Sequence, residues 1–380
     1  MTQRRTDNTL FYTIVALVFF GVVMIFSASS AVAETRYKLE MTHFLKQQLL
    51  WLALGIPVLI IFKRLEYTEL NKAQWAFGAV GIVVMLQVLA IIIDPKLHRW
   101  IRIAGFGLQP SELAKPALIL FLAFFVTWKQ RAINNGRYSI APAAMVLGLL
   151  FIAIGWGDLG TSIVLAITAG VMFFIAGLRW RAFGAATALL LIATTVFVCQ
   201  KGYRVGRLVG FIDPEYRILD IVDPNEHIKK YVRESSSSGD YHYQAEQATI
   251  AVGSGGVFGV GLMQSAQKLL FLPEAQTDCI YAVVGEELGL WGTTGVLFGF
   301  LIILWRGIRL AFIARDDFGR YLALGLTVCI IVQAFVNMTM VLDLLPTKGI
   351  PLPMISYGGS SLLSSLICLG MLLSVSEQAS

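Results

Sequence analysis

The sequence predicts an all-α, polytopic membrane protein with about ten transmembrane helices, and three observations lead to this class. First, 57% of the 380 residues are hydrophobic and only 14% are charged, whereas a soluble domain carries roughly 25% charged residues. Second, the mean hydropathy is +0.71, which leaves a water-soluble enzyme nowhere to bury its apolar surface. Third, the apolar stretches are continuous rather than alternating, which argues against a β-barrel.

The ten apolar runs are, in order, residues 10–32, 44–62, 75–93, 113–128, 140–156, 159–178, 183–200, 279–305, 321–342 and 360–375. The first run follows Arg4 and Arg5 and ends near a potential signal-peptidase site at residues 31–33. It is longer than the roughly 7–15 residues of a signal-peptide core, so we expect a retained first helix, the alternative being a mature chain that starts at Glu34. The fourth run is the weakest, because Glu112 and Lys115 stand at its start.

Basic residues predict how the chain is oriented. Loops on the side of the two termini hold fourteen of the 30 lysines and arginines, and the opposite short loops and helix ends hold eight. Because cytoplasmic loops carry the excess of basic residues, both termini are expected in the cytoplasm. Segments 94–112, 201–278 and 343–359 are then extracytoplasmic, and the chain is a multi-pass protein of a bacterial cytoplasmic (inner) membrane with its site facing outward.

One large extracytoplasmic loop, residues 201–278, is expected between the seventh and eighth helices of a single domain that spans residues 1–380. Residues 235–239 (SSSSG) read as a flexible linker. Residues 245–272 are apolar and punctuated by glycine, which indicates an ordered element next to the membrane. Within it, residues 253–261 (GSGGVFGVG) match no phosphate-binding motif and predict a tight backbone turn.

The remaining composition excludes several classes of function. The net charge of +6 could suggest nucleic acid, but the basic residues sit in short clusters between apolar runs, so we expect no nucleic-acid partner. The four cysteines are widely spaced, and the four histidines show no metal spacing. No metal-binding or serine–histidine nucleophile motif is present.

Asp278 stands where the large loop meets the eighth apolar run. It can serve as an N-cap of that helix or as a general base whose basicity is raised by partial burial. Glu286, eight residues on, would lie roughly 12 Å along a continuous helix and on the same half as Asp278. A carboxylate inside a membrane helix costs several kcal/mol unless it is paired or hydrated, so either an ion pair with another helix or a polar cavity shared with Asp278 is expected.

A second group of charged residues precedes and begins the fourth helix. Glu112 and Lys115 share a helix face and can pair with each other. Alternatively, Lys115 can bind phosphate as a point charge and Arg99 in a forked geometry. Trp100 is most simply an interfacial aromatic residue.

Two further outer segments carry polar residues. Asp158, in residues 157–162 (GDLGTS), caps the sixth helix or forms a polar wall of the outer cavity. Lys348 and Ser356 lie in a segment with two prolines and two adjacent glycines. That segment is either an ordinary turn or a re-entrant loop, since irregular backbone at membrane depth must be buried or line a cavity. Taken alone, these residues do not separate an enzyme from a transporter.

The chain resembles the FtsW/RodA family, also called SEDS proteins, in residues 109–115 (QPSELAK), 158–162 (DLGTS), 272–289 (LPEAQTDCIYAVVGEELG) and 351–361 (PLPMISYGGSS). Residues 203–208 and 251–256 also resemble that family's loop. Residues 264–278 and 344–353 look more like the division branch, FtsW, than the elongation branch, RodA. The chain departs from the family pattern at Trp156 and Gly157, at Cys279, and in a longer serine-rich insertion at 215–242.

The resemblance implies a peptidoglycan glycosyltransferase that polymerises lipid II during septal wall synthesis. Lipid II is a disaccharide-pentapeptide on undecaprenyl pyrophosphate. The resemblance further implies that Asp278 is the catalytic base and that Arg99, Trp100, Glu112, Lys115, Asp158 and Glu286 bind substrate or support the site. Lys348 and Ser356 are added as candidate substrate-binding residues.

The resemblance also implies partners, namely a class B penicillin-binding transpeptidase and other membrane proteins of the division machinery. No cofactor is assigned, although a divalent cation such as Mg²⁺ or Mn²⁺ stays open as a further source of charge compensation for pyrophosphate. Two rival functions stay open as well: a flippase or other transporter of lipid-linked precursors, and a non-catalytic scaffold of cell division.

Overall fold

The computed structural model of the chain describes residues 6–35, 37–94, 99–103, 106–212 and 240–379. Ten apolar helices make up most of it: α1 (Asn8–Thr35), α2 (His43–Arg64), α3 (Ala73–Ile93), α4 (Pro110–Lys129), α5 (Ala141–Gly155), α6 (Leu159–Ile175), α7 (Trp180–Cys199), α13 (Ile280–Ile313), α14 (Asp317–Val341) and α15 (Gly359–Ala379). Shorter elements are the helical turns Tyr67–Leu70, Gln130–Ala132 and Gly136–Ile140, the strands β1 (Ile101–Ile103) and β2 (Phe106–Leu108), and the helices α8 (Gly202–Ile212), α11 (Asp240–Gly255) and α12 (Gln267–Leu270).

The prediction of about ten transmembrane helices is confirmed within the described residues. Nine helices are long and apolar enough to cross a membrane, and α6, with 17 residues, is the shorter tenth. Each of the ten predicted runs falls on one of these helices. The agreement follows from the solvent, because a segment that spans hydrocarbon must be apolar over about 20 residues.

The helices differ greatly in how deeply they are buried. The span of α15 is 83% buried, and α4 and α14 are nearly as enclosed, so these three form the centre of the bundle. The span of α7 is 0% buried, which places it on the periphery. Large apolar side chains on the outer faces, such as Phe19, Ile92, Leu189 and Phe298, are exposed and suit a lipid environment.

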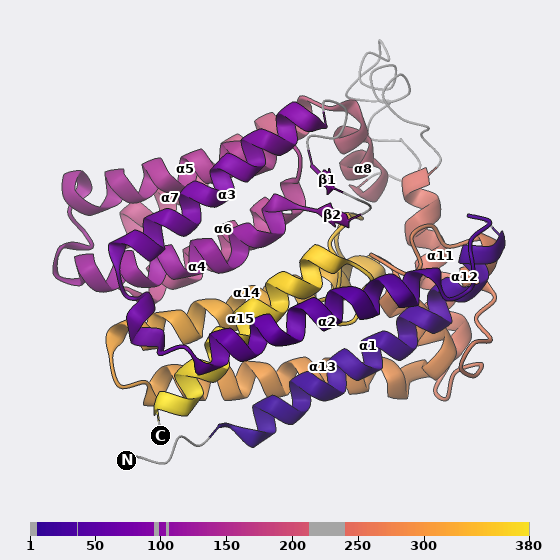
Figure 1. Cartoon of the computed structure of the whole chain (residues 1–380). Helices are drawn as coiled ribbons and strands as arrows, with labels where there is room; N and C mark the ends of the chain where they lie inside the picture. The colour runs from indigo at the N-terminus through magenta and orange to yellow at the C-terminus, as the bar shows by residue number, and fades with distance from the viewer. Residues whose placement is uncertain (1–5, 36, 95–98, 104–105, 213–239, 380) are drawn as a thin grey trace, which may run out of the picture.

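The two termini lie together at one end of the bundle, and β1, β2, α8, α11 and α12 lie at the other, here called the loop end (Figure 1). The strands form a two-stranded antiparallel hairpin in which Ile101 pairs with Leu108. The large loop between the seventh and eighth membrane helices is thus partly helical. The predicted linker 235–239 and most of the insertion 215–242 lie outside the described residues.

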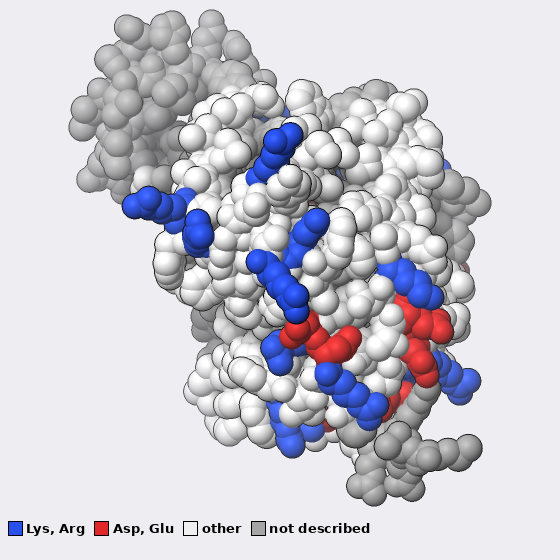
Figure 2. All heavy atoms as spheres, turned by 90° about the vertical axis from the view of Figure 1, so that its left-hand side faces the viewer, with Lys and Arg blue, Asp and Glu red and all other residues white. Residues whose placement is uncertain are grey.

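The end of the bundle that carries the termini shows many lysine and arginine side chains, with smaller groups of acidic side chains between them (Figure 2). Nine exposed basic residues come from the helix ends and loops there: Arg64, Lys72, Arg131, Arg137, Arg179, Arg181, Arg309, Arg315 and Arg320. This distribution is the one that the positive-inside rule associates with a cytoplasmic face. The assignment of membrane sides stays a prediction.

The eighth membrane helix is broken, which the sequence did not predict. Gly289 in α13 has φ 64° and ψ −154°, so a short helical segment precedes the break and a long one follows it. The glycine-rich residues 256–261 pack directly on this break. The amide of Val260 donates to the carbonyl of Glu286 at 2.9 Å, and the amide of Leu290 donates to the carbonyl of Gly256 at 3.0 Å. The predicted tight turn therefore satisfies peptide groups that the break sets free.

Candidate active site

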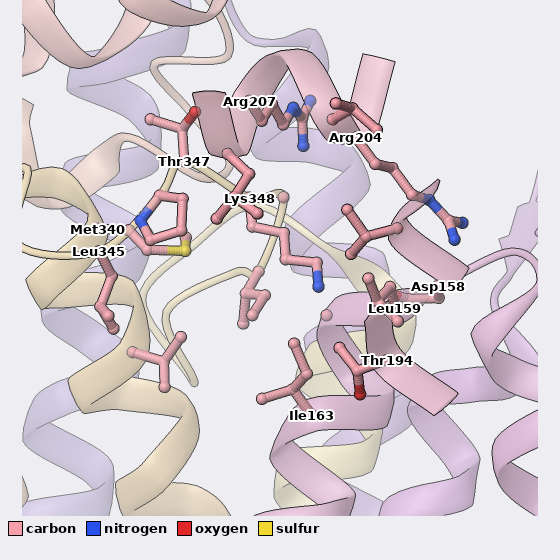
Figure 3. A pocket seen from close by; sticks show the side chains of 18 of the residues that line it. Asp158, Leu159, Ile163, Thr194, Arg204, Arg207, Met340, Leu345, Thr347 and Lys348 are labelled. Carbon is pink, nitrogen blue, oxygen red and sulfur yellow. The ribbon is translucent and has the colours of Figure 1, made fainter. Parts of the chain in front are cut away.

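A cavity of about 560 Å³ opens at the loop end, between α6, α7, α8, α14 and residues 345–350 (Figure 3). Its polar part is cationic and is formed by Arg99, Arg204, Arg207 and Lys348 beside Asp158. Its remaining walls are apolar and include Ile163, Ile167, Val198, Val336 and Met340. One cavity thus offers a positively charged region that continues into an apolar groove between membrane helices.

Asp158 organises the polar part of the cavity. Its Oδ1 accepts a hydrogen bond from the amide of Thr161 at 3.2 Å, so it caps α6, as one of the two sequence interpretations holds. Its Oδ2 accepts from Gln109 at 2.7 Å and from Ser111 at 2.9 Å, and it lies 3.4 Å from Nη2 of Arg99. Burial raises the pKa of Asp158, but the Arg99 charge and these hydrogen bonds outweigh it and lower the pKa to about 2. Asp158 is therefore a permanent anion that orients Arg99.

Asp278 lies just before α13, and its carboxylate lies against Gly349, which lines the cavity. Cys279, not Asp278, is the N-cap residue of α13, and the Asp278 carboxylate accepts no hydrogen bond from the described residues. Burial raises the pKa of Asp278 and outweighs the nearby charges of Arg99 and Arg207, which lower it, so that the pKa is about 7. A half-buried carboxylate without a fixed partner and with a pKa near neutrality has the properties required of a general base.

Lys348 contributes an amine to the same cavity from the loop before α15, and Figure 3 shows it pointing toward Asp158. No hydrogen bond or ion pair within the described part of the chain takes up its Nζ. Burial and the positive charges of Arg204 and Arg207 together lower the pKa of Lys348 to about 7, against the attraction of Asp158, which raises it. In its protonated form, this amine has no ion-pair partner within the described residues and can bind an anionic ligand.

Arg204 and Arg207 of α8 complete the cationic region. Arg204 also donates to the carbonyl of Phe197 at 3.0 Å and to that of Trp156 at 3.1 Å, at the ends of α7 and α5. Because those carbonyls end helices, the arginine is favourably placed at their negative ends. These contacts fix α8 over the cavity.

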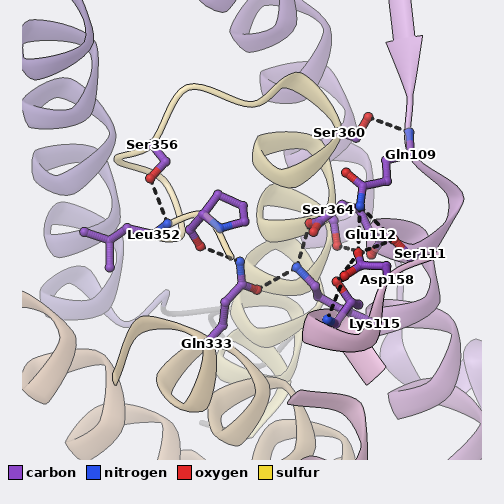
Figure 4. Close-up of polar contacts among 12 residues, drawn as sticks. Gln109, Ser111, Glu112, Lys115, Asp158, Gln333, Leu352, Ser356, Ser360 and Ser364 are labelled. Atoms are coloured by element: carbon purple, nitrogen blue, oxygen red, sulfur yellow. Dashed lines mark hydrogen bonds and ion pairs between the residues drawn. The ribbon is translucent and has the colours of Figure 1, made fainter. Parts of the chain in front are cut away.

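The other predicted residues of the fourth helix lie away from the cavity lining. Lys115 donates to Glu112 at 2.6 Å and to Gln333 at 2.6 Å, and all three side chains are buried (Figure 4). Of the two alternatives for Lys115, pairing with Glu112 is therefore the one that the structure shows. The ring of Trp100 packs against Gly107 of β2: a Cβ atom at Gly107 would lie 3.2 Å from the ring.

Within the described residues, Glu286 forms no ion pair and does not line the cavity, so neither of the two arrangements expected for it is found. Its Oε1 accepts the amide of Ala266 at 2.9 Å, and its Oε2 accepts the hydroxyl of Ser265. It thereby caps the short helix α12.

Ser356 holds the loop before α15. Its hydroxyl accepts the amide of Leu352 at 2.8 Å, and residues 352–356 are buried although their backbone is irregular. This is the arrangement expected of a re-entrant loop. The substrate-binding roles assigned to Trp100, Glu112, Lys115, Glu286 and Ser356 stay predictions.

Several residues that build the site were not predicted from the sequence. Gln109 and Ser111 bind Asp158, while Gln333 and Asn337 of α14 bind the loop that carries Lys348. Gln333 and Asn337 did leave a signal, because amides inside an apolar run must find partners in the protein. Arg204 and Arg207 appeared only as part of the family resemblance.

Few side chains at the cavity could hold a metal ion. Within the described residues, no group of three or more histidine, cysteine, aspartate or glutamate side chains lies close enough to hold one. The Asp158 oxygens are taken by hydrogen bonds and Arg99, which leaves Asp278 as the carboxylate available at the cavity. A divalent cation stays a prediction, and no step proposed for the site depends on one.

Replacing Gly349 by alanine is expected to displace the Asp278 carboxylate. A Cβ at Gly349 would lie 2.8 Å from Oδ2 of Asp278, closer than a carbon–oxygen contact allows. We expect the turnover rate of the purified protein to fall by about tenfold or more, since misplacement of a reacting group by 1 Å can cost up to 10²-fold. Gly295→Ala on α13 is the matched control, because nothing lies within 4 Å of its Cβ position. Equal rates for the two variants would contradict the close approach.

Comparison with known proteins agrees with this architecture. The family profile described as "Cell cycle protein", of FtsW, RodA and SpoVE, matches residues 7–380. The chain is 39% identical to the Probable peptidoglycan glycosyltransferase FtsW of Geobacter metallireducens, over 98% of this chain and 95% of the relative. It is 35% identical to the Stage V sporulation protein E of Bacillus subtilis, over 99% of each.

Two solved structures share the fold. A chain from a study of polymerization and crosslinking by a peptidoglycan synthase complex superposes with a TM-score of 0.73 at 24% identity, covering 98% of both chains. The rod shape determining protein RodA of Thermus thermophilus gives 0.68 at 23% identity, over 98% of this chain and 96% of that one. The profile match over nearly the whole length and the full-length relatives establish that this multi-pass membrane protein is a member of the FtsW/RodA/SpoVE family.

Proposed function

We propose that the protein is a peptidoglycan glycosyltransferase that polymerises lipid II at the extracytoplasmic face of the inner membrane. The observation that carries the proposal is the cavity at the loop end, in which a cationic region continues into an apolar groove beside the unpaired carboxylate of Asp278. A polyprenyl pyrophosphate would fit both regions, because its pyrophosphate is anionic and its polyprenyl chain is apolar. The names of the full-length relatives support the same activity.

In the proposed reaction, Asp278 accepts the proton of the 4-hydroxyl group of the acceptor sugar. That oxygen attacks the anomeric carbon of the lipid-linked donor, the bond from this carbon to the pyrophosphate oxygen breaks, and the configuration inverts from α to β. Both electrons of the broken bond leave with the pyrophosphate. Arg99 and Lys348 line the cavity and supply positive charge for that leaving group. Lys115 is engaged by Glu112 and Gln333, so it is not assigned this role.

We further propose that a class B penicillin-binding transpeptidase assembles with this protein and cross-links the new strand, with other division proteins as additional partners. A structural neighbour comes from a peptidoglycan synthase complex, and this supports the partnership. The identity of 37–39% to proteins named FtsW, against 23% to RodA of Thermus thermophilus, supports a role in septal synthesis.

The direct test uses the purified full-length protein in liposomes with lipid II and penicillin, which blocks cross-linking but not sugar transfer. Glycan chains on a gel are the expected result. Movement of lipid II across the bilayer without any glycan would instead identify a flippase. If neither glycan chains nor transported lipid II are found, even with the transpeptidase partner present, the protein acts as a scaffold.

The pH dependence of kcat/KM is expected to be bell-shaped, with limbs on either side of about pH 7. Asp278, whose pKa is about 7, must be ionised to accept a proton, so the rate rises with pH through that value. Lys348, also with a pKa of about 7, must be protonated to bind pyrophosphate, so the rate falls as pH rises further. Lys348→Arg should move the alkaline limb to higher pH, because arginine stays protonated, and leave the acidic limb in place. An unchanged alkaline limb in this variant would remove Lys348 from the assignment.

A further inference from the structure

Asp278 and Lys348 come from two loops that are separate in sequence, and neither side chain is fixed by a hydrogen bond within the described residues. Proximity catalysis requires such groups to keep one relative position. The two loops do touch, because Gly349 lies against the Asp278 carboxylate. The amide of Tyr357 also donates to the carbonyl of Gln276 at 2.9 Å.

Asn337 of α14 binds both loops with one group. Its Nδ2 donates to the carbonyl of Asp278 at 2.8 Å and to the carbonyl of Ile350 at 2.8 Å. Two carbonyl acceptors require the NH₂ side of the amide to face them, so the orientation of this side chain is determined by its partners. The side chain is 0% exposed. Asn337 therefore ties the residue that carries the carboxylate to the loop that carries the amine.

Gln333 lies one turn earlier on the same face of α14. Its Nε2 donates to the carbonyl of Pro351 at 2.8 Å, and its Oε1 accepts from Lys115 at 2.6 Å (Figure 4). Lys115 is in turn paired with Glu112 in the interior of α4. The buried Glu112–Lys115 pair is therefore connected to the Lys348 loop through the amide of Gln333. The pair does not line the cavity, so it can affect the site only by holding this loop in place.

We propose that Gln333 and Asn337 are positioning residues for sugar transfer, which set the distance between Asp278 and the 348–351 loop from one face of α14. The proposal rests on the proposed function, because it assigns these amides to the reaction of Asp278. It also gives the Glu112–Lys115 pair a role: the pair fixes the acceptor end of Gln333, so that its donor end stays on Pro351.

Two substitutions separate positioning from folding. Asn337→Leu has a similar volume and removes both hydrogen bonds to the two loops. Gln333→Glu keeps an acceptor for Lys115 but cannot donate to Pro351. Thr339→Val is the matched control on α14, because its hydroxyl bonds only within the helix, to the carbonyls of Phe335 and Val336.

Each variant is purified at full length, and kcat, KM and the pH dependence of kcat/KM are measured with lipid II. We expect kcat to fall by about 10- to 100-fold in Asn337→Leu, in the same direction in Gln333→Glu, and not in Thr339→Val. KM should change much less than kcat. The acidic limb should also move to lower pH in Asn337→Leu, as Asp278 gains water while the same charges (Arg99, Arg207, Glu274 and Asp158) still face it.

A loss of rate that only follows the loss of folded protein, with an unmoved acidic limb, would overturn the positioning role. So would an unchanged kcat in both variants. If Asn337→Leu does not fold, the result for Gln333→Glu decides. Asp278→Asn is measured in parallel: an inactive Asp278→Asn beside fully active amide variants defeats only this inference, whereas an active Asp278→Asn defeats the proposed function.

Discussion

Asp278→Asn is expected to reduce the rate of lipid II polymerisation by about 10²–10⁴-fold, the usual contribution of a general base. Asparagine has nearly the same shape as aspartate but cannot accept a proton at neutral pH. The Asp278 carboxylate has no hydrogen-bond donor among the described residues, so the exchange removes no structural contact. The measurement is the single-turnover rate of glycan formation in liposomes, together with the melting temperature of the purified variant.

Asp343→Asn is the matched control for this experiment. Asp343 is an exposed carboxylate at the loop end of α14 with φ 54°, a conformation that asparagine also tolerates. It should polymerise lipid II at the rate of the unmodified protein. Native activity in Asp278→Asn would show that another group accepts the proton.

Lys268→Met is expected to destabilise the protein by about 3–5 kcal/mol, the usual cost of removing one partner of a buried ion pair. Nζ of Lys268 lies 2.5 Å from Oε1 of Glu287, and both side chains are almost inaccessible, at 2% and 0%. Ser27 of α1 donates to the other oxygen of Glu287 at 2.5 Å. Without the lysine, the carboxylate stays buried with no countercharge. A lower melting temperature of the solubilised protein measures the effect.

The double variant Lys268→Met with Glu287→Gln provides the control. It removes both charges, so most of the lost stability should return, because neutral partners carry no uncompensated charge. A double variant as unstable as Lys268→Met alone would mean that packing around the lysine stem, rather than charge, causes the loss.

The membrane helices could be predicted closely because one physical requirement fixes them. Lipid offers no hydrogen bonds, so spanning segments must be long, apolar and helical. All ten runs were located in this way, even α6 with 17 residues. The break at Gly289 could not be located, because it depends on residues 256–261 packing against it from a distant part of the chain.

The site was predicted in part. Asp278, Arg99, Asp158 and Lys348 were named from local patterns and the family resemblance, and they meet around one cavity. Lys115 was a candidate for the same region, but its amine points to Glu112 and Gln333. No local pattern distinguishes a lysine that faces a cavity from one that faces a neighbouring helix.

The sequence by itself determined that the chain lies in a membrane, how many times it crosses, and which loops carry acidic and basic residues. Only the tertiary structure decided which charges are neutralised by each other and which stay unpaired beside the groove. The reason is that apolar length acts over neighbouring residues along the chain. The way the helices pack determines that Lys268 pairs with Glu287 and that Lys115 pairs with Glu112 and Gln333. It also leaves Asp278 and Lys348 without a hydrogen-bond or ion-pair partner among the residues that the structure describes.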